Sequence, residues 1–365
     1  MGRILIITPE FPPQPGGIGN HAWNLASQLQ QNNYEVLVIT NSRNESEKES
    51  EFDNKQSVII KRIAKSNFNT LTYLKRVILI KNQLKLFNPN IVFFSGKFPI
   101  WMLGVLRLKN SIKKIAVVHG SELTISNKFK RWLLLTGLSK SFKIIAVSNF
   151  TKSLIPKEFH SKTEVINNGF NKHALKRNSV IRNDKESLDL ITVGAMSQRK
   201  GQHNVIKVLP LLKEKYKHIK YHIVGIPGYR AQLEELSIAL DVKNEVVFHN
   251  VLHQNELNDL LAKSTIFMML SQPGDSGELE GFGIALLEAN YVGIPSIGSK
   301  NCGIEDAIND RKSGILVDAF NLAEIECAIE EIMSNYKQYQ QNTLEWSKMF
   351  TWEEVVKNYI NIIES

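Results

Sequence analysis

Two glutamates eight positions apart are the strongest indication of chemistry in this chain. Glu280 precedes, and Glu288 lies within, a segment typical of a helix, and Gly281 and Gly283 stand between them. Carboxylates accept hydrogen bonds from hydroxyl groups. Because glycine lacks a Cβ, backbone N–H groups can approach a ligand closely, and a helix that begins near Gly283 points its unpaired donors and positive dipole end at the same place. The pattern predicts a sugar, a diphosphate and a ribose bound in a row. An ordinary strand–loop–helix crossover with solvated glutamates is the alternative.

Two neighbouring cations follow another apolar strand. Arg199 and Lys200 lie between the run ending at Gly194 and the next helical segment. From there they can reach a diphosphate, whose negative charge grows when a bond to it breaks. A Lys–Gly pair in a surface loop is also common, so this pair alone is weak support.

Metal-binding and redox patterns are missing from the sequence. No Asp-x-Asp pair suited to Mg²⁺ or Mn²⁺ is present, and the nine histidines do not cluster at ligand spacing. We therefore expect no metal and no cofactor, with Arg199, Lys200 and the helix start near Gly283 neutralising the charge. The two cysteines, Cys302 and Cys327, form no disulfide framework, which fits a reducing cytoplasm.

The elements that must position these residues alternate between strand and helix along the whole chain. Short apolar, β-branched runs are separated by segments of helical periodicity, which predicts an α/β fold. A polar stretch without periodicity, residues 171–187, predicts a linker, after which the same alternation begins again. Residues 41–55 are polar and charged and suggest a mobile loop. Residues 71–84 form an amphipathic pattern that either packs on the sheet or rests on a membrane surface.

Charge is divided unevenly between the two halves. Residues 1–170 contain 24 Lys and Arg against 10 Asp and Glu, whereas residues 171–365 contain 21 against 26. A basic half attracts nucleic acid, anionic lipid head groups or a phosphorylated acceptor, or simply reflects a Lys-rich composition. No motif that reads RNA or DNA is present, so nucleic acid is not expected as a partner. No apolar run approaches the length of a membrane-spanning helix.

The stretch Glu280-Gly-Phe-Gly-Ile-Ala-Leu-Leu-Glu288 resembles the Glu-x7-Glu motif of family 4 retaining glycosyltransferases. This resemblance implies that the first glutamate and the backbone amides after it hold the donor sugar, and that the second glutamate holds the ribose of the nucleotide. The donor-binding residues implied here are Glu280, Gly281, Phe282, Gly283, Ile284 and Glu288.

Three further elements resemble the same family. The loop Pro-Pro-x-x-Gly-Gly-x-Gly, which contains Gly17 and Gly19, resembles the amino-terminal loop near the donor phosphates and the acceptor. His119 stands in a His-Gly-x-Glu element, whose histidine is implied to face the donor sugar and the acceptor. Lys200 matches the lysine of Gly-Arg-x4-Lys-Gly, but Ala195 stands where most members have a phosphate-binding arginine. We expect Arg199 to replace that arginine.

The resemblance implies a GT-B architecture, in which two Rossmann-like domains face each other across the site. Residues 1–170 are expected to form the acceptor-binding domain, joined by a returning helix within residues 350–365. Residues 171–349 are expected to form the donor-binding domain. The catalytic residues implied are His119, Lys200 and Glu280.

The expected activity is transfer of a hexose or N-acetylhexosamine from a UDP- or GDP-sugar, with retention. The acceptor is a lipid-linked or saccharide molecule of cell-surface polysaccharide or lipopolysaccharide synthesis, as for the bacterial mannosyl-, glucosyl- and N-acetylglucosaminyltransferases that the chain resembles. The expected place is the cytoplasm, with peripheral contact at the inner membrane face. Two alternatives remain: a non-catalytic nucleotide-sugar-binding subunit, favoured only by Ala195, and a sugar-nucleotide epimerase.

Retention suggests two carboxylates around the anomeric carbon, as in retaining hydrolases. Glu280 and Glu288 are better explained as groups that bind hydroxyls. We therefore expect front-face substitution, in which the leaving phosphate helps to deprotonate the acceptor and His119 stabilises the positive charge on the sugar.

Overall fold

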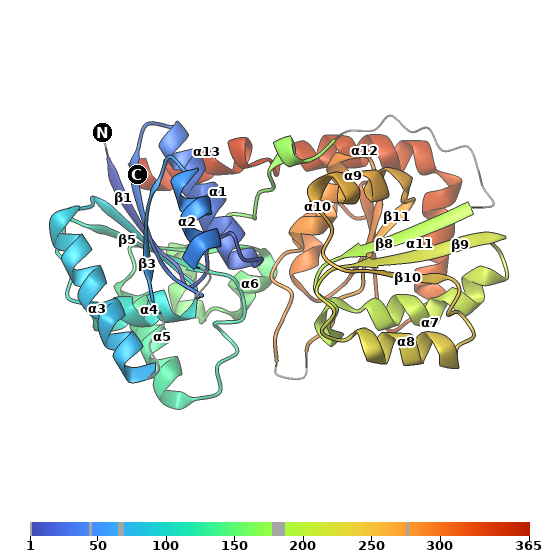
Figure 1. The fold of residues 1–365 in the computed structure, drawn as a ribbon, viewed down its shortest axis with the longest axis horizontal. Coiled ribbons are helices and arrows are strands. Elements are labelled where there is room, and N and C mark those ends of the chain that lie inside the picture. Colours follow the sequence, from blue (N-terminus) through green and yellow to red (C-terminus); the bar gives the residue numbers. More distant parts are fainter. Residues whose placement is uncertain (1, 44–45, 65–68, 177–186, 275–276) are drawn as a thin grey trace. The chain divides into compact units, whose positions relative to one another are not determined.

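Parallel strands form two separate sheets in the computed structural model, which describes residues 2–43, 46–64, 69–176, 187–274 and 277–365 (Figure 1). The first sheet has seven strands in the order β3-β2-β1-β4-β5-β6-β7, and the second has six in the order β10-β9-β8-β11-β12-β13. All paired strands are parallel. The α/β fold expected from the alternation of elements is confirmed.

The chain divides into two compact units. Unit 1 comprises residues 1–168 and 352–365, and unit 2 comprises residues 169–351. The strands of unit 1 are β1 (Arg3–Ile7), β2 (Glu35–Asn41), β3 (Ile59–Ile63), β4 (Ile91–Ser95), β5 (Lys113–Val118), β6 (Lys143–Ala146) and β7 (Thr163–Val165). Its α-helices are α1 (Gly17–Gln31), α2 (Ser46–Asn54), α3 (Asn69–Leu86), α4 (Lys97–Val105), α5 (Lys128–Lys140), α6 (Asn149–Leu154) and α13 (Trp352–Glu364).

Unit 2 repeats the alternation of strand and helix. Its strands are β8 (Ser187–Val193), β9 (His218–Val224), β10 (Val246–His249), β11 (Ile266–Met269), β12 (Ser296–Ser299) and β13 (Gly314–Val317). Its α-helices are α7 (Gln202–Lys213), α8 (Arg230–Ala239), α9 (Gln254–Lys263), α10 (Ile284–Tyr291), α11 (Leu322–Ser334) and α12 (Tyr336–Lys348). Short 3₁₀ turns complete the chain at η1 (Lys157–Lys162), η2 (Lys172–Ala174), η3 (Gln198–Lys200) and η4 (Gly303–Ala307).

The central strands are buried on both faces. Every residue of β4 and of β11 is buried, which explains why these strands are continuous apolar runs rather than alternating ones. Each unit has its own core. In unit 1 it gathers residues such as Leu5, Val92 and Ala116, and in unit 2 residues such as Leu190 and Tyr221. Two independent cores are what two independently folded units require.

The last helix of the described chain packs against the first. Figure 1 shows α13, coloured red, beside the blue α1. Tyr359 of α13 is fully buried, and its hydroxyl lies 2.8 Å from Nε2 of His21 on α1. The backbone carbonyl of Ile363 accepts a hydrogen bond of 3.0 Å from Lys113 at the start of β5. The expected return of the carboxyl-terminal helix to the first domain is confirmed.

Two expectations need correction or restriction. Residues 41–55 are not an irregular loop, because α2 spans Ser46–Asn54 and its Glu49 is only 3% exposed. The sequence pattern did not predict this helix because its buried residue, Glu49, is a carboxylate. Such a residue is expected at the surface unless its partners are known. The expected linker, residues 171–187, lies largely outside the described residues, which resume at Ser187.

Candidate functional site

Arg199, Lys200 and Glu280 meet in unit 2. Nζ of Lys200 lies 2.8 Å from Oε2 of Glu280, and the Arg199 guanidinium donates a hydrogen bond to the same oxygen. These three side chains come from two loops about eighty positions apart, one after β8 and one before α10. The Glu280 residue is 9% exposed. Burial alone would raise the pKa of Glu280, but the charges of Lys200 and Arg199 outweigh burial and hold this pKa below its ordinary value.

Close backbone packing fixes the loop that carries the two cations. Gly201 has φ +71°, and a Cβ there would lie 1.7 Å from the carbonyl oxygen of Leu270 at the end of β11. The backbone N–H of Gln272 donates a hydrogen bond of 3.0 Å to the carbonyl of Arg199. The Lys200 side chain runs across Gly194, whose missing Cβ would meet the Lys200 Cε at 3.2 Å. Glycine is therefore required at position 201 by contact with backbone, and it is favoured at position 194 by a φ of +155°.

Gly303 packs directly against the loop from Glu280 to Gly283. A Cβ on Gly303 would lie 2.0 Å from the carbonyl oxygen of Gly281, and the Gly303 N–H donates to the Glu280 carbonyl at 3.0 Å. Gly283 has φ +96° and directly precedes α10, which begins at Ile284. The unpaired N–H groups of the first turn of α10 therefore follow Glu280 closely along the chain, and the helix begins where the sequence pattern predicted. Phe282 is 2% exposed and packs inward, with its ring 6.0 Å from that of Phe350.

Glu288 lies one turn into α10 and is half-buried. No hydrogen bond or ion pair reaches its carboxylate among the residues that the structure describes. Burial raises the pKa of Glu288 to about 7. A half-buried carboxyl group without a partner is well suited to accept hydroxyl donors from a ligand.

The glycines at the start of α1 differ in their surroundings. A Cβ on Gly19 would lie 3.1 Å from the backbone nitrogen of Phe11, so the helix packs closely on the preceding loop at this point. A Cβ on Gly17 would meet nothing within 4 Å. Gly19 is thus explained by packing within unit 1, whereas Gly17 leaves free space at the helix start.

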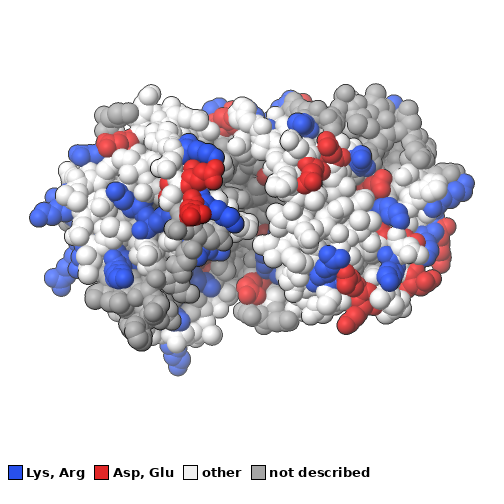
Figure 2. Space-filling model, viewed as in Figure 1, with Lys and Arg blue, Asp and Glu red and all other residues white. Residues whose placement is uncertain are grey.

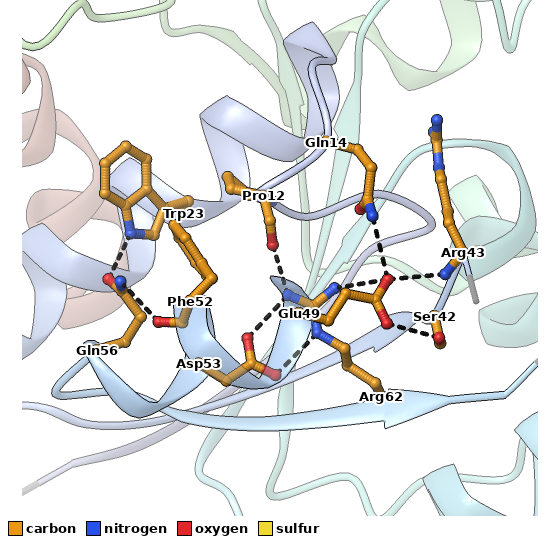
Figure 3. Close-up of polar contacts among 10 residues, drawn as sticks. All are labelled: Pro12, Gln14, Trp23, Ser42, Arg43, Glu49, Phe52, Asp53, Gln56 and Arg62. Carbon is orange, nitrogen blue, oxygen red and sulfur yellow. Dashed lines mark hydrogen bonds and ion pairs between the residues drawn. The ribbon is translucent and has the colours of Figure 1, made fainter. Parts of the chain in front are cut away.

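A buried ion cluster holds the loop before α1 in place (Figure 3). The Arg62 guanidinium on β3 makes a bidentate ion pair with Asp53, with both contacts at 2.8 Å, and also donates to the carbonyl of Pro12. Its other amino group lies 3.6 Å from Glu49, which accepts a hydrogen bond of 3.3 Å from the Gln14 side chain. Helix α2 and strand β3 therefore position the proline-rich loop.

His119 lies at the end of β5, in a polar setting within unit 1. Its Nε2 is 2.8 Å from the Ser95 hydroxyl at the end of β4, and its backbone N–H donates to Glu122 at 3.1 Å. Burial lowers the pKa of His119 to about 4, so the imidazole is neutral at neutral pH. The ring of His21 packs edge-on against it at 5.1 Å.

Glu122 is completely buried. Burial raises the pKa of Glu122, although backbone N–H groups of its own turn oppose this effect. One of its oxygens accepts the His119 N–H, and the other has no hydrogen-bond partner among the described residues. The Glu122 carboxyl group therefore fixes the turn that presents His119.

Comparison with known proteins identifies the family. Residues 15–173 match the family model described as Glycosyltransferase Family 4, and residues 175–345 match the one described as Glycosyl transferases group 1. The chain belongs to glycosyltransferase family 4. Together the two matches span nearly all of the chain, and they establish that this protein is a glycosyltransferase.

Two relatives align with almost the whole glycosyltransferase. An uncharacterized glycosyltransferase of Methanocaldococcus jannaschii is 26% identical, with 97% of this chain and 96% of the relative covered. A GDP-mannose-dependent alpha-(1-6)-phosphatidylinositol monomannoside mannosyltransferase of Mycolicibacterium smegmatis is 24% identical, with 91% and 89% covered.

Solved structures place the fold among GT-B glycosyltransferases. A glycosyltransferase from Rickettsia africae superposes with a TM-score of 0.81 at 19% identity, covering 99% of this chain and 97% of that one. The Anabaena protein HepE, in complex with UDP and glucose, superposes with a TM-score of 0.79 at 16% identity, covering 99% of both chains. At these identities the likeness concerns the fold alone, and the expected GT-B architecture is confirmed.

The described part of this glycosyltransferase has neither a metal-binding cluster nor a helix suited to span a membrane. Within residues 2–43, 46–64, 69–176, 187–274 and 277–365, no group of three or more His, Cys, Asp or Glu side chains is arranged to hold a metal ion. Over the same ranges, no helix combines the length and apolar character needed to cross a bilayer.

Sequence reasoning found the residues that meet in unit 2 but missed their supports. Ser95, the partner of His119, ends a buried strand beside β5, and that position was the available signal. The contact between His21 and Tyr359 joins residues 338 positions apart and leaves no trace in a single sequence. The role of Gly303 as backing for Gly281 depends equally on the folded loop.

Proposed function

We propose that this protein is a retaining glycosyltransferase that moves a hexose or N-acetylhexosamine from a UDP- or GDP-sugar to a lipid-linked or saccharide acceptor of cell-surface polysaccharide or lipopolysaccharide synthesis. The observation that carries the proposal is the convergence of Arg199 and Lys200 on Glu280 beside the start of α10. Two cations and a helix N-terminus suit a diphosphate, and a carboxylate next to them suits a sugar hydroxyl.

The donor sugar is the first specific choice to test. Mannosyltransferases named as GDP-mannose-dependent align with this chain at 24% and 25% identity over at least 91% of its length. This favours GDP-mannose as the first donor. UDP-sugars are the necessary comparison, because structural neighbours of the same fold have been solved with UDP and UDP-glucose.

Lys200, Arg199 and the amino end of α10 act on the leaving group in this proposal. As the bond between the anomeric carbon and the phosphate oxygen breaks, negative charge accumulates on the nucleoside diphosphate, and these groups neutralise it without a metal. The acceptor oxygen attacks from the same face, and its proton passes to the departing phosphate oxygen. Configuration at the anomeric carbon is thereby retained.

His119 and the two glutamates take separate roles. Neutral His119 faces the sugar and stabilises its developing positive charge through the imidazole lone pair and ring dipole. Glu280 and the amides of Gly281 to Ile284 bind sugar hydroxyls. Glu288, which has no described partner, accepts hydrogen bonds from the ribose hydroxyls, and those donors favour its ionised form.

Acceptor recognition belongs to unit 1 in this proposal. The amino-terminal part of the acceptor site comprises Gly17, which has open space around it, and the proline-rich loop that Arg62 holds. The enzyme works in the cytoplasm and meets a lipid-linked acceptor at the inner face of the membrane. This location agrees with relatives named for mannosylation of phosphatidylinositol mannosides.

A second candidate is a non-catalytic nucleotide-sugar-binding subunit. Ala195 favours it, because it removes the arginine that most family members have at this position. The two candidates predict different fates for a bound donor.

A turnover assay on the purified protein separates the candidates. GDP-mannose and UDP-sugars are each supplied with a membrane lipid extract as acceptor, and release of GDP or UDP is measured together with glycolipid formation. Turnover with an α-linked product from an α-linked donor supports the proposal, and NMR of the product gives the anomeric configuration. Donor-dependent thermal protection without turnover supports the subunit, since a ligand that binds the native state raises apparent stability. An altered sugar nucleotide without acceptor would indicate an epimerase, and an inverted linkage would refute retention.

A further inference from the structure

Helix α5 of unit 1 exposes two stacked aromatic side chains. Phe129 is 66% exposed and Trp132 is 57% exposed. Their ring centroids lie 5.9 Å apart at an interplanar angle of 26°. Large aromatic residues side by side on a surface mark an interaction site more often than a single exposed apolar residue does. The pair therefore indicates an interaction site on this surface.

The packing of α4 on α5 explains why these rings point outward. A Cβ on Gly137 of α5 would lie 2.1 Å from the carbonyl oxygen of Ile100, and one on Gly104 of α4 would lie 2.8 Å from the carbonyl oxygen of Leu133. The two helices thus touch backbone to backbone. No room remains between them for a large ring, and the aromatic side chains of α5 lie outside the contact.

The same surface continues on α4 and carries positive charge. Val105 is 57% exposed, and the ammonium of Lys130 lies 5.8 Å from the centroid of the Trp101 ring. All five residues from Lys128 to Trp132 are exposed, and three of them are cationic. We call this surface the α4–α5 face and define it by Trp101, Val105, Lys128, Phe129, Lys130, Arg131 and Trp132.

Charge around the α4–α5 face is almost entirely of one sign. Residues 54–157 contain 20 Lys and Arg but a single acidic residue, Glu122, and Glu122 is fully buried. In the view of Figure 2, the charged side chains in the lower part of the left-hand unit are Lys and Arg, whereas the red side chains on that unit lie in its middle and upper parts. Acidic residues resume at Glu158 and Glu164, but the cations within the face itself favour an anionic partner.

We propose that the α4–α5 face docks on the surface of a bilayer that contains anionic lipids. Phe and Trp rings settle at the head-group level of a membrane, with an apolar body and, for Trp, a polar N–H in one side chain. Lys and Arg beside them gain from the negative surface potential. This inference rests on the proposed lipid-linked acceptor and assigns the surface by which the enzyme reaches it.

A bilayer fits this face better than a nucleic acid. Phe129 and Trp132 stack on each other, so a base cannot insert between their rings, and the sequence contains no motif that reads RNA or DNA. Bases bind single-stranded sites by stacking on free aromatic faces. The alternative surface within unit 1 is α3, whose exposed large apolar side chains among the described ones, Ile78 and Leu86, are aliphatic. The α4–α5 face alone combines stacked rings with flanking cations among the described surfaces of unit 1.

Vesicle sedimentation tests the inference. The probe is a vesicle of phosphatidylcholine, with or without phosphatidylglycerol, at low and high salt. We expect the intact protein to sediment with the anionic vesicles and to be released by salt, because exposed charges are screened. The double variant F129S/W132S is expected to bind at least about tenfold more weakly, since both interfacial anchors are lost.

A matched control is available in unit 2. Phe320 is also 66% exposed, and Phe320→Ser should leave vesicle binding unchanged. Donor-dependent thermal protection should be the same for all variants, so loss of vesicle binding with intact donor binding separates this inference from the proposed function. Equal binding of F129S/W132S and the intact protein would overturn the inference. Tighter binding to single-stranded RNA than to anionic vesicles, lost in F129S/W132S, would assign the face to nucleic acid instead.

Discussion

Replacing Arg199 by alanine tests whether this residue compensates for Ala195. Arg199 and Lys200 contact the same oxygen of Glu280, so the guanidinium stands beside the ammonium that matches the family's phosphate-binding lysine. If both cations bind the donor diphosphate, Arg199→Ala removes one charge-assisted contact. Such a contact stabilises by about 1.5–3 kcal/mol. Donor affinity and kcat/KM are therefore expected to fall by about tenfold to a hundredfold.

The same substitution should change stability little. Glu280 keeps Lys200 at 2.8 Å, so its buried carboxylate is not left without a partner. The Arg199 side chain is 27% exposed, and solvent screens part of its interaction. We expect the free energy of unfolding to change by less than about 1 kcal/mol.

Isothermal titration with the nucleoside diphosphate and initial-rate kinetics measure the effect, and urea unfolding checks stability. Arg311→Ala is the matched control, since Arg311 is an exposed arginine of unit 2 that pairs with Glu331. Ala195 is exposed and can accommodate a larger side chain, so A195R in the Arg199→Ala background is expected to recover part of the lost affinity. Unchanged donor binding and turnover in Arg199→Ala would refute the compensation.

Three further outcomes follow from individual side chains. Burial raises the pKa of Glu288 to about 7, so the native state holds this proton more tightly than the unfolded chain does. The stability that the protonated group contributes is therefore lost as pH rises towards 7. Glu288→Gln should raise the melting temperature at pH 8, with a gain that shrinks towards pH 5, and should weaken donor binding. The Lys162 ammonium donates hydrogen bonds to three backbone carbonyls at the end of α5. Lys162→Met should lower the free energy of unfolding, measured by urea denaturation, by about 1–2 kcal/mol after allowing for the partial exposure of this lysine. Lys157→Met, at an exposed lysine, is the control. Gly303→Ala should displace the Gly281 carbonyl, 2.0 Å from the added Cβ, and abolish thermal protection by the donor; protection at wild-type level would contradict this role.

Patterns along the chain predicted the architecture because they are local. Continuous apolar runs such as β4 and β11 show burial on both faces, and the stop after each run predicts the loop that follows. The start of α10 was predicted from Gly283, whose left-handed φ excludes most other residues. These features depend on a few neighbouring residues, and a single sequence contains them.

What the sequence could not predict depends on distant partners. Glu49 looks like a surface residue in a charged segment, yet it is buried because Arg62, Ser42 and the Arg43 backbone all reach it. The direction of the Glu280 pKa likewise depends on two cations some eighty positions away, because burial alone would shift it the opposite way. A charged residue's role is set by its partners, and these are known only from the fold.

The closure of unit 1 by α13 has a consequence for how the protein is made. His119 packs against His21, and His21 contacts Tyr359, so the surroundings of this histidine include a residue translated after all of unit 2. During synthesis, unit 1 lacks α13 after residues 1–168 have been made, until about 180 further residues have been translated. A nascent chain interrupted before Trp352 would contain the residues that converge on Glu280 but would lack the helix that covers His21. The cluster of Arg199, Lys200 and Glu280 is thus translated in full before the helix that completes the surroundings of His119.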